Sequence, residues 1–371
     1  MSFIESIHNI AQHYPEKTAV VAYSHSAGIE DSTRLSYAEV YEAMTLGKPL
    51  PIPLLGNSWD GDFTLHTTGS TGTPKAVTIS QQMVMRNSLN LIHAHGYEED
   101  LQFIIAGPMD HLGCWSKLFP TLMVGGTLHI LPNGMKDMEA FFNIMRNHSK
   151  RYASFLVPSA IRILIQFASE RLSCCSDRIE FIETGGAPIA HSDMLRLCEL
   201  LPDSRLYNTY ASTEAGIVAT YNYNDGLCKP GCCGTPFPNV GFSINSDGVI
   251  QGSSDMGYLD EDNMLHITGR TDDIINVGGL KVSPVEIEEA AMAIKGIRDC
   301  ICISRNHPIM GHVPELLVVI ESQASNLTPK NIIRSLAASL EPFKIPQFVR
   351  KVDTINRTFN GKPDRLSYKN T

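Results

Sequence analysis

The chain has 371 residues, 43% of them hydrophobic, and carries a formal net charge of −9 at pH 7. A chain of this length predicts two domains, or one large domain with a small one. Its acidic balance, with no run of more than two basic residues, argues against a nucleic-acid surface, which needs clustered Lys and Arg. No apolar run approaches the roughly 18 residues of a membrane helix, and residues 1–17 lack the layout of a signal peptide. We therefore expect a cytoplasmic protein with no membrane or nucleic-acid partner.

The nine cysteines raise the question of a metal site. Cys174 and Cys175 are adjacent, and Cys228 lies shortly before Cys232 and Cys233. The paired C-x2-C spacing that is typical of zinc sites is absent. We therefore interpret the cysteines as reduced thiols, buried or at the surface, and expect no structural metal.

Strand-like segments alternate with helix-like segments from about residue 60 to residue 210. The strand-like segments are residues 62–67, 101–108, 127–131, 153–158, 179–184 and 205–210. The helix-like segments are residues 81–96, 112–124, 137–147, 159–170 and 192–200. This alternation predicts a layered α/β fold with a largely parallel sheet. Ligands of such sheets collect at the loops beyond the carboxyl ends of the strands.

The pattern changes twice after the last of these strands. Residues 228–260 are dense in glycine with short strand signals, which predicts a small β-rich subdomain. From Val282 the predicted elements form a compact α+β module: a helix over 284–294, strands over 299–304 and 315–322, a helix over 329–340 and a strand over 347–352. The polar, glycine-rich segment 269–279 separates the two parts, as hinges often do. We therefore predict a large layered α/β domain with a β-rich subdomain over 1–271 and a small, mobile α+β domain over 272–371.

One loop, "TTGSTGTPK" at residues 67–75, carries a chemical signal of its own. It offers several hydroxyls, backbone N–H groups freed by two glycines and one lysine, which together can cradle phosphates. It is not a Walker A loop, because Thr73 and Pro74 separate Gly72 from Lys75. These residue types also favour ordinary solvated turns, so the loop alone leaves both interpretations open.

Five motifs in order resemble those of the adenylate-forming (AMP-binding) superfamily, which includes acyl- and aryl-CoA ligases, adenylation domains of peptide synthetases and luciferases. They are the loop 67–75, "ETGGAPI" (183–189), "NTYASTEAG" (208–216), the block 253–289 and "NRTFNGKPDR" (356–365). Residues 13–44 also resemble the first motif of that family. Fewer than thirty residues then separate Tyr37 from the phosphate loop, so most of the family's N-terminal lobe is missing. The resemblance implies that the pocket is either more open than in the family or completed by a second copy of the chain, as a homodimer.

The resemblance implies that the chain binds ATP and Mg²⁺. Lys362 would be the catalytic lysine, carried by the C-terminal lid domain, that meets the α-phosphate and the substrate carboxylate; an exposed surface lysine is the alternative. Thr213 would bond the α-phosphate. Glu214 would bind Mg²⁺, whereas its other interpretation is a carboxylate at a helix N-terminus. The phosphate-loop residues assigned to ATP are Thr67, Thr68, Gly69, Ser70, Thr71, Gly72, Thr73 and Lys75.

The family pattern also implies the residues around the nucleoside. Tyr210 would stack on adenine, and Ala211 stands where the family usually has glycine. Asp255 would bind the ribose hydroxyls beside Arg270; an ordinary turn aspartate and a surface ion pair are the alternatives. The other residues assigned to ATP are Gly185, Gly186, Ala187, Pro188, Asn208 and Ser212.

The remaining assignments concern the acyl and thiol side. Asp272 would be the hinge about which the C-terminal domain turns between two poses. Gly278, Gly279 and Lys281 would form the thiolation loop, although an ordinary glycine turn is the alternative. His111 would gate the passage between acyl pocket and thiol tunnel, or be an ordinary loop histidine. The acyl pocket is expected near Gly113, Val157-Pro158 and Thr184-Gly185.

These motifs together predict an ATP-dependent carboxylic acid–CoA ligase. The acid and ATP give an acyl-adenylate and pyrophosphate, and the thiol of CoA then displaces AMP. An acceptor thiol on a carrier protein is the alternative. Short bacterial o-succinylbenzoate–CoA ligases have a similar layout, which makes that activity a specific candidate. A nucleotide-binding protein without catalysis is the third interpretation, which the presence of all the implied catalytic residues disfavours.

Overall fold

The computed structural model describes residues 2–24, 32–48, 50, 62–68, 74–109, 112–227, 229–324, 326–358 and 362–368. For residues 66–68, 74 and 75 it describes the backbone alone. No helix within these ranges is long and apolar enough to cross a membrane.

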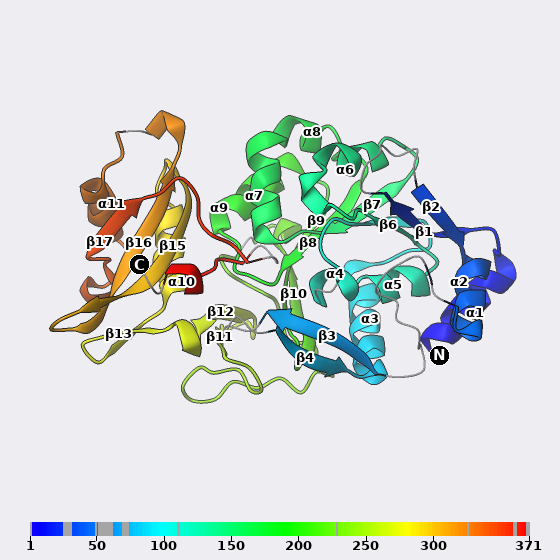
Figure 1. Ribbon diagram of the computed structural model, residues 1–371, viewed down its shortest axis with the longest axis horizontal. Coiled ribbons are helices and arrows are strands. Elements are labelled where there is room, and N and C mark those ends of the chain that lie inside the picture. The colour runs from blue at the N-terminus through cyan, green and yellow to red at the C-terminus, as the bar shows by residue number, and fades with distance from the viewer. Residues whose placement is uncertain are drawn as a thin grey trace.

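The larger part of the molecule is built on an eight-stranded sheet of order β10-β9-β8-β7-β5-β6-β1-β2 (Figure 1). The six inner strands are parallel, and β2 and β10 join the two edges antiparallel. This arrangement confirms the predicted layered α/β fold. The strands of this sheet are β1 (Thr18–Tyr23), β2 (Ser32–Ser36), β5 (Leu101–Ile105), β6 (Thr127–Ile130), β7 (Arg151–Phe155), β8 (Ile179–Gly185), β9 (Arg205–Ser212) and β10 (Gly216–Asn222).

The apolar runs of the inner strands are explained by burial on both faces of the sheet. All five residues of β5 are buried, and Phe103 and Ile105 belong to one core whereas Ile104 belongs to the other. In β8, Phe181 and Ile182 divide in the same way. Successive side chains of a strand point to opposite faces, so a strand covered on both sides is expected to be largely apolar.

Helices cover both faces of the large sheet (Figure 1). Ser80 caps the start of α3, whose end lies at Gly96 in the left-handed conformation, as the sequence predicted. The single helix expected over 112–124 is instead two short helices. Pro120 lies in the first turn of the second one, where a missing N–H breaks no helical hydrogen bond. The helices of this part are α1 (Phe3–His13), α2 (Tyr37–Leu46), α3 (Gln81–His95), α4 (Leu112–Trp115), α5 (Leu118–Met123), α6 (Met138–Ile144), α7 (Pro158–Phe167), α8 (Ser169–Ser173) and α9 (His191–Leu200).

Two separate hairpins flank the sheet (Figure 1). One pairs β3 (Phe63–Thr68) with β4 (Pro74–Ile79), and its connecting loop carries the predicted phosphate-binding residues. The other pairs β11 (Asp255–Leu259) with β12 (Leu265–Arg270). The stretch 229–254 before β11 is held by isolated bridges rather than long strands, and its apolar residues pack with Tyr210 and Val218. This part corresponds to the predicted β-rich subdomain.

The C-terminal part has its own sheet, of order β14-β13-β16-β15 with β17 beside β16. Helices α10 and α11 cover one face, where Ile287 and Ile332 are fully buried. On the other face Ile301 and Leu317 are covered by Ile355, which belongs to the segment after β17. The chain after β17 runs toward the large domain (Figure 1). The elements are η3 (Thr271–Asp273), β13 (Ile275–Val277), β14 (Leu280–Val282), α10 (Pro284–Met292), β15 (Ile297–His307), β16 (Gly311–Ile320), α11 (Pro329–Leu336) and β17 (Phe348–Lys351).

Candidate active site

The carboxyl ends of β8 and β9 form the floor of the candidate site. At Gly185 any side chain would meet the carbonyl oxygen of Thr209, since a Cβ there would lie 2.6 Å from it. Gly186 has φ of +78°, a conformation that favours glycine. The two strands can thus approach closely and turn out of the sheet. The turn places Ala187 and Pro188 at the border with the C-terminal part, where they line a small pocket.

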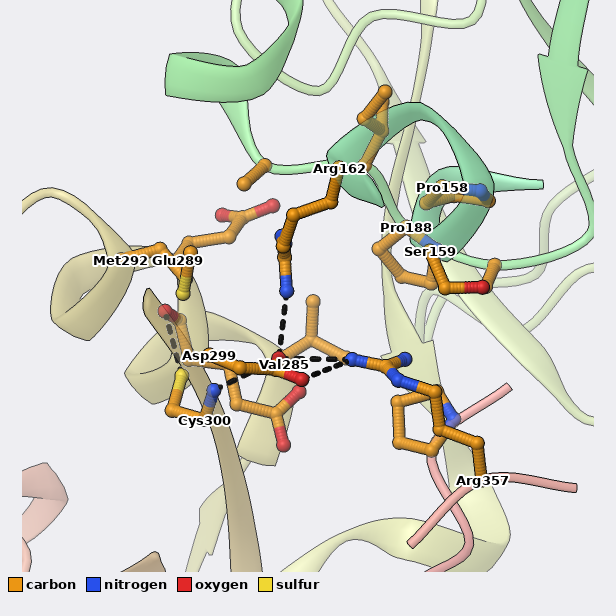
Figure 2. A pocket seen from close by; sticks show the side chains of 15 residues that line it. Pro158, Ser159, Arg162, Pro188, Val285, Glu289, Met292, Asp299, Cys300 and Arg357 are labelled. Carbon is orange, nitrogen blue, oxygen red and sulfur yellow. Dashed lines mark hydrogen bonds and ion pairs between the residues drawn. The ribbon is translucent and has the colours of Figure 1, made fainter. Parts of the chain in front are cut away.

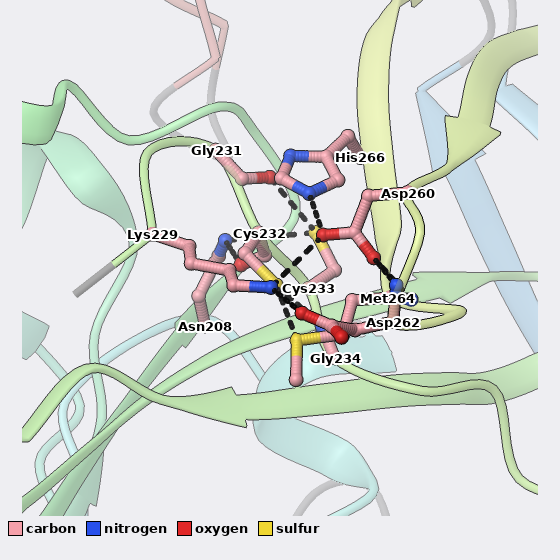
Figure 3. Close-up of polar contacts among 10 residues, drawn as sticks. All are labelled: Asn208, Lys229, Gly231, Cys232, Cys233, Gly234, Asp260, Asp262, Met264 and His266. Atoms are coloured by element: carbon pink, nitrogen blue, oxygen red, sulfur yellow. Dashed lines mark hydrogen bonds and ion pairs between the residues drawn. The ribbon is translucent and has the colours of Figure 1, made fainter. Parts of the chain in front are cut away.

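Asn208 on β9 is buried and holds the neighbouring segment in place (Figure 3). Its Nδ2 donates to the carbonyl oxygen of Cys232 at 2.8 Å. Burial raises the pKa of the Cys233 thiol to about 12, so this cysteine is a neutral thiol at physiological pH. Asn208 was assigned to the nucleotide, and its amide nitrogen is used for this internal contact. Among the described residues no group of three or more His, Cys, Asp and Glu side chains could hold a metal ion.

A second polar cluster fixes the β11–β12 hairpin against that segment (Figure 3). Lys229 forms ion pairs with Asp260 at 3.3 Å and with Asp262. His266 Nε2 lies 3.1 Å from the same Asp260 carboxylate. The backbone N–H of Met264, together with these side chains, holds the pKa of Asp260 well below its usual range. The cluster carries no reacting group, but it sets where the first residue of β11 lies.

Tyr210, Asp255 and Arg270 meet at that point. Tyr210 donates its hydroxyl to Asp255 Oδ2 at 2.9 Å, and Arg270 Nη1 donates to Oδ1 at 2.9 Å. Burial and the Asp255 charge raise the pKa of Tyr210, so the phenol stays a neutral donor. Arg270 Nη2 also lies 3.7 Å from Asp272 in η3. The structure therefore joins the predicted ribose residues to the predicted adenine side chain and to the hinge position.

Lys362 reaches the same place from the C-terminal part. Burial and the positive charge of Arg270 lower the pKa of Lys362, and the carboxylate of Asp255 opposes this effect. Its ammonium has no hydrogen-bond or ion-pair partner among the described residues, whereas its carbonyl oxygen accepts from Thr358 N at 2.8 Å. A partly desolvated cation is thus held beside the predicted ribose site with its donors unused.

Arg365, three residues after Lys362, anchors this segment, although the sequence motif gave it no role. Its Nη2 donates to Glu288 Oε2 at 3.0 Å, and its Nη1 donates to the carbonyl oxygen of Cys302 at 2.8 Å. Its Nε lies 3.5 Å from Asp273, next to the predicted hinge. The arginine that ends the quoted motif "NGKPDR" could have been singled out from the sequence, because a guanidinium can pair with a carboxylate through two parallel hydrogen bonds.

Thr213 and Glu214 lie in the turn between β9 and β10. The alternative of a carboxylate at a helix N-terminus is wrong, because the two strands are joined antiparallel without a helix. Ser212 Oγ accepts from Ala215 N at 3.0 Å and shapes the turn. Glu214 is exposed, and no hydrogen bond or ion pair of its carboxylate is found among the described residues. A bare carboxylate at this turn suits a hard cation that otherwise keeps water and phosphate ligands.

The predicted thiolation loop does not join this group. Gly278 and Gly279 form the turn of the β13–β14 hairpin, and Gly278 N donates to the carbonyl oxygen of Met310 at 3.0 Å. Lys281 is exposed. In Figure 1, β13 extends to the side of the C-terminal sheet that is turned away from the large domain. Of the residues predicted for the site in the C-terminal domain, Lys362 is the one whose pKa responds to the charges of Arg270 and Asp255.

Several predicted residues lie outside the described residues. They are His111 and the loop residues Gly69, Ser70, Thr71, Gly72 and Thr73. The backbones of Thr67, Thr68 and Lys75 belong to β3 and β4, and their side chains are not described. Ala211 is half-buried on β9 beside Tyr210.

A buried ion pair escaped the sequence reasoning. Lys117 Nζ lies 2.7 Å from Glu183 Oε1, and the two side chains are 2% and 0% exposed. His95 Nδ1 lies 3.6 Å from the other oxygen of Glu183. Burial together with Lys117 lowers the pKa of His95, so this histidine is neutral. Glu183 directly precedes Thr184-Gly185, where the acyl pocket was predicted.

Comparison with known families identifies the family of this chain. Residues 56–257 match the family described as AMP-binding enzyme, and residues 286–362 match the AMP-binding enzyme C-terminal domain. The chain therefore belongs to the AMP-binding enzymes, and it is an adenylate-forming ligase that joins an acid to a thiol.

Particular relatives differ in acid and acceptor. The 3,4-dihydroxybenzoate–[aryl-carrier protein] ligase of Bacillus anthracis is 26% identical, over 81% of this chain and 71% of its own. The 2-succinylbenzoate–CoA ligase of Staphylococcus aureus (strain MW2) is 26% identical, over 91% of this chain and 73% of its own. The chain spans about two thirds of the length of the curated relatives it matches.

Solved structures share the fold. The ATP-bound MatB from Rhodopseudomonas palustris has a TM-score of 0.72 at 23% identity, over 82% of this chain and 68% of its own. The o-succinylbenzoate coenzyme A synthetase (MenE) from Bacillus subtilis, in complex with AMP, has a TM-score of 0.76 at 16% identity. It covers 99% of this chain and 98% of its own. These likenesses confirm the predicted fold class.

Proposed function

We propose that the protein activates a carboxylic acid with MgATP as an acyl-adenylate and then transfers the acyl group to the thiol of CoA. The observation that supports this proposal is that Tyr210 and Arg270 both bond Asp255, while the charges of Arg270 and Asp255 act on the pKa of Lys362 from the other part of the chain. These residues come from both parts of the chain, and a nucleotide beside them would have a cation next to its phosphates.

The first step joins a carboxylate oxygen to the α-phosphorus of ATP and releases pyrophosphate. Negative charge grows on the α-phosphate as the bond forms, and the unused donors of Lys362 are available to stabilise it. Asp255 would accept from the ribose hydroxyls while Arg270 and Tyr210 keep its carboxylate oriented. Thr213, in the turn that follows β9, would donate to the α-phosphate.

Magnesium is the metal that such a site implies, and the donor set fits it. Glu214 supplies one exposed carboxylate, and Mg²⁺ typically uses one or two protein carboxylates with waters and phosphates. When bound, the ion neutralises phosphate charge. Glu214 would hold it, and the loop 67–75 would hold the leaving phosphates.

The second step needs a different part of the C-terminal domain. We infer that this domain, from about residue 272, turns at Asp272 and brings Gly278 and Gly279 to the site after adenylation. The support is their position on the outer hairpin and the contacts of η3 with Arg270 and Arg365. The thiolate of CoA would then attack the acyl carbon, and AMP would leave with the bonding electron pair.

The acid and the acceptor thiol can be chosen for testing from those that the names of the relatives give. The names of the relatives divide between CoA and an aryl-carrier protein, and their acids include 3,4-dihydroxybenzoate, oxalate and 2-succinylbenzoate. We propose CoA as acceptor and test 2-succinylbenzoate first, because that relative covers 91% of this chain. The homodimer implied by the short N-terminal segment stays a prediction, and sedimentation of the full chain would check it.

The test is pyrophosphate release from MgATP with these acids and benzoate, each with and without CoA. We expect release that depends on one acid and becomes multiple-turnover when CoA is added, with AMP and thioester formed in equal amounts. Lys362→Ala should lower the rate by at least about a hundredfold, the size of effect seen when one donor to a developing charge is removed. Lys330→Ala, an exposed lysine on α11, is the control and should leave it unchanged. Full activity in Lys362→Ala would contradict the mechanism.

A further inference from the structure

Four charged side chains meet where the C-terminal part packs on the large domain, and Figure 2 shows three of them, Arg162, Asp299 and Arg357. Arg162 on α7 donates from Nη1 to Asp299 Oδ1 on β15 at 2.6 Å. The same guanidinium donates from Nε to Asp193 on α9 at 2.9 Å. Asp299 in turn accepts from Arg357 Nη2 at 2.6 Å and 2.8 Å through its two oxygens. The cluster thus links α7 and α9 of the large domain, through one carboxylate, to the segment before Lys362.

Arg357 is part of the structure that holds the lysine. It pairs with Pro363 in an antiparallel bridge across the loop. Asp364 N donates to the carbonyl oxygen of Asn356 at 2.9 Å, and Thr358 N donates to that of Lys362 at 2.8 Å. The backbone around Arg357 therefore fixes the backbone of Lys362. A displacement of the Arg357 side chain would therefore also displace the backbone of Lys362 and, with it, the proposed catalytic ammonium.

The cluster can open without leaving a buried charge alone. If Asp299 moves away from α7, Arg162 retains Asp193 and Asp299 retains Arg357. The side chains of Arg162, Asp193 and Asp299 are 14%, 12% and 18% exposed, so an uncompensated charge there would be costly. Because each partner keeps an opposite charge in both arrangements, the bond from Arg162 to Asp299 can form and break reversibly. This is what an enzyme with two domain poses requires of a contact between the domains.

The same junction borders the nucleotide loop. The pocket beside Arg162 is lined by Ala187 and Pro188, which follow the glycines at the end of β8, and by Pro363, which follows Lys362. The contact therefore lies directly behind the place where the two halves of the site meet.

We propose that Arg162 is a positioning residue for acid activation. It captures Asp299 and, through Arg357, holds Lys362 on the nucleotide side; the bond to Asp299 is broken when the thiolation hairpin turns in. The kinetic part of this inference, the effect of Arg162 on acid activation, rests on the proposed function. The structural part, that Arg162 holds the C-terminal domain, rests on the interface alone. Arg162 touches neither substrate nor reacting atoms and acts through Asp299.

The kinetic test compares the two half-reactions in Arg162→Met. Acid-dependent pyrophosphate release should fall about tenfold, as expected when one charged hydrogen bond of about 1.5 kcal/mol is lost. Thioester formation from the chemically prepared adenylate of the same acid should change less than about twofold, since that step uses the other pose. Arg162→Lys keeps the charge and should recover most of the loss. Arg196→Met, an exposed arginine on α9 that pairs only with Glu199 among the described residues, is the matched control.

A double-mutant cycle shows whether Asp299 carries the effect. In the Asp299→Asn background, Arg162→Met should have almost no further effect on pyrophosphate release, because the partner is already lost. Additive losses would overturn the proposed route through Asp299. Equal losses in both half-reactions would mean that Arg162 has only a general structural role.

Amide hydrogen exchange tests the contact without any acid. In Arg162→Met, exchange should rise at least threefold in peptides from α7, α10 and residues 355–358, with β5, β7 and β16 unchanged. Unaltered exchange at these segments in a folded variant would refute the inference. If the unmodified protein releases no pyrophosphate with any acid, the proposed function fails, and the exchange result alone decides whether Arg162 holds the domain.

Discussion

Two buried ionic groups of this molecule differ in how their charges are shared. Within the large domain, Lys117 and Glu183 are nearly inaccessible to solvent, and Glu183 is the one carboxylate that Lys117 pairs with among the described residues. Between the domains, Arg162 and Asp299 are also largely buried, but each has a second partner of opposite charge. We call the first pair closed, because neither of its charges has a second partner of opposite charge among the described residues. The second pair belongs to a chain of four charges.

This difference predicts that the first pair contributes to the stability of the fold and that the second takes part in the motion of the C-terminal domain. Removing one member of a closed pair leaves a charge in an apolar core, which strongly destabilises the fold. A shared pair can separate while every charge stays compensated, so its geometry can depend on domain pose. We therefore expect Lys117 and Glu183 to set the shape of the pocket floor, and Arg162 and Asp299 to set the order of the reaction steps.

The largest expected effect is the loss of stability in Lys117→Met. Glu183 would be left buried without its cation, and we expect the free energy of unfolding of the large domain to fall by about 3–5 kcal/mol. Urea denaturation at pH 7 measures this change. The double variant with Glu183→Leu, which removes both charges, should recover most of the loss.

Arg162→Met in the same denaturation series sharpens the contrast. We expect its unfolding free energy to fall by less than that of Lys117→Met, because Asp299 keeps Arg357 and only Asp193, which is 12% exposed, loses its cation. A loss as large as that of Lys117→Met would show that the interdomain cluster is a closed structural pair as well, and the proposed distinction would fail.

An effect smaller than that of Lys117→Met is also expected at Arg365, which anchors the lysine segment inside the C-terminal domain. Arg365→Met removes its paired bonds to Glu288, and charged hydrogen bonds of this kind contribute about 1.5–3 kcal/mol. We expect the C-terminal domain to lose about 2 kcal/mol of stability, measured by hydrogen exchange of β15 and β16 amides. Arg334→Met, exposed on α11, is the control and should not change exchange. An equally protected sheet in Arg365→Met would contradict the anchoring role.

The sequence predicted the parts of the molecule that local pattern determines. Strand β5 is largely apolar because both of its faces are buried, and α3 ends at Gly96 because glycine permits the left-handed turn. The motif residues Tyr210, Asp255 and Arg270 were found by their order in the chain, and the structure brings them into contact. Their roles toward ATP stay predictions.

The remaining features depend on contacts between distant segments. Lys117 and Glu183 are 66 residues apart, and Arg162 and Asp299 are 137 apart, so no periodicity or motif relates them. A lysine in a short helical segment is usually interpreted as exposed. The split of the predicted helix 112–124 could have been found from Pro120, since proline is tolerated only in the first turn.

The smallest expected effect is a shift in the pH dependence of activity, which relates both regions to Lys362, the proposed catalytic lysine. Burial and Arg270 lower the pKa of Lys362 below the ordinary value of about 10.4 for lysine. Acid activation needs the ammonium, so kcat/KM for ATP should fall as the pH rises through this lowered pKa, with an alkaline limb below that of an ordinary lysine. Folding lowers the pKa, so the unfolded chain binds more protons in this interval. Titration of Lys362 therefore makes the fold more stable as pH rises, and the fall in rate does not come from unfolding caused by this group.

Two variants test the direction in which neighbouring charges move this alkaline limb of the pH profile. Arg270→Gln removes the repelling charge and should move it to higher pH, whereas Asp255→Asn removes the attracting charge and should move it to lower pH. Lys362→Arg, which stays protonated, should lose the limb at whatever rate it retains. Because Arg162 acts on the position of Lys362 and not on its charge, Arg162→Met should lower the rate at every pH and leave the midpoint in place. A displaced midpoint in Arg162→Met would mean that the interdomain cluster alters the electrostatics of the site, and that the two regions are less separate than their contacts indicate.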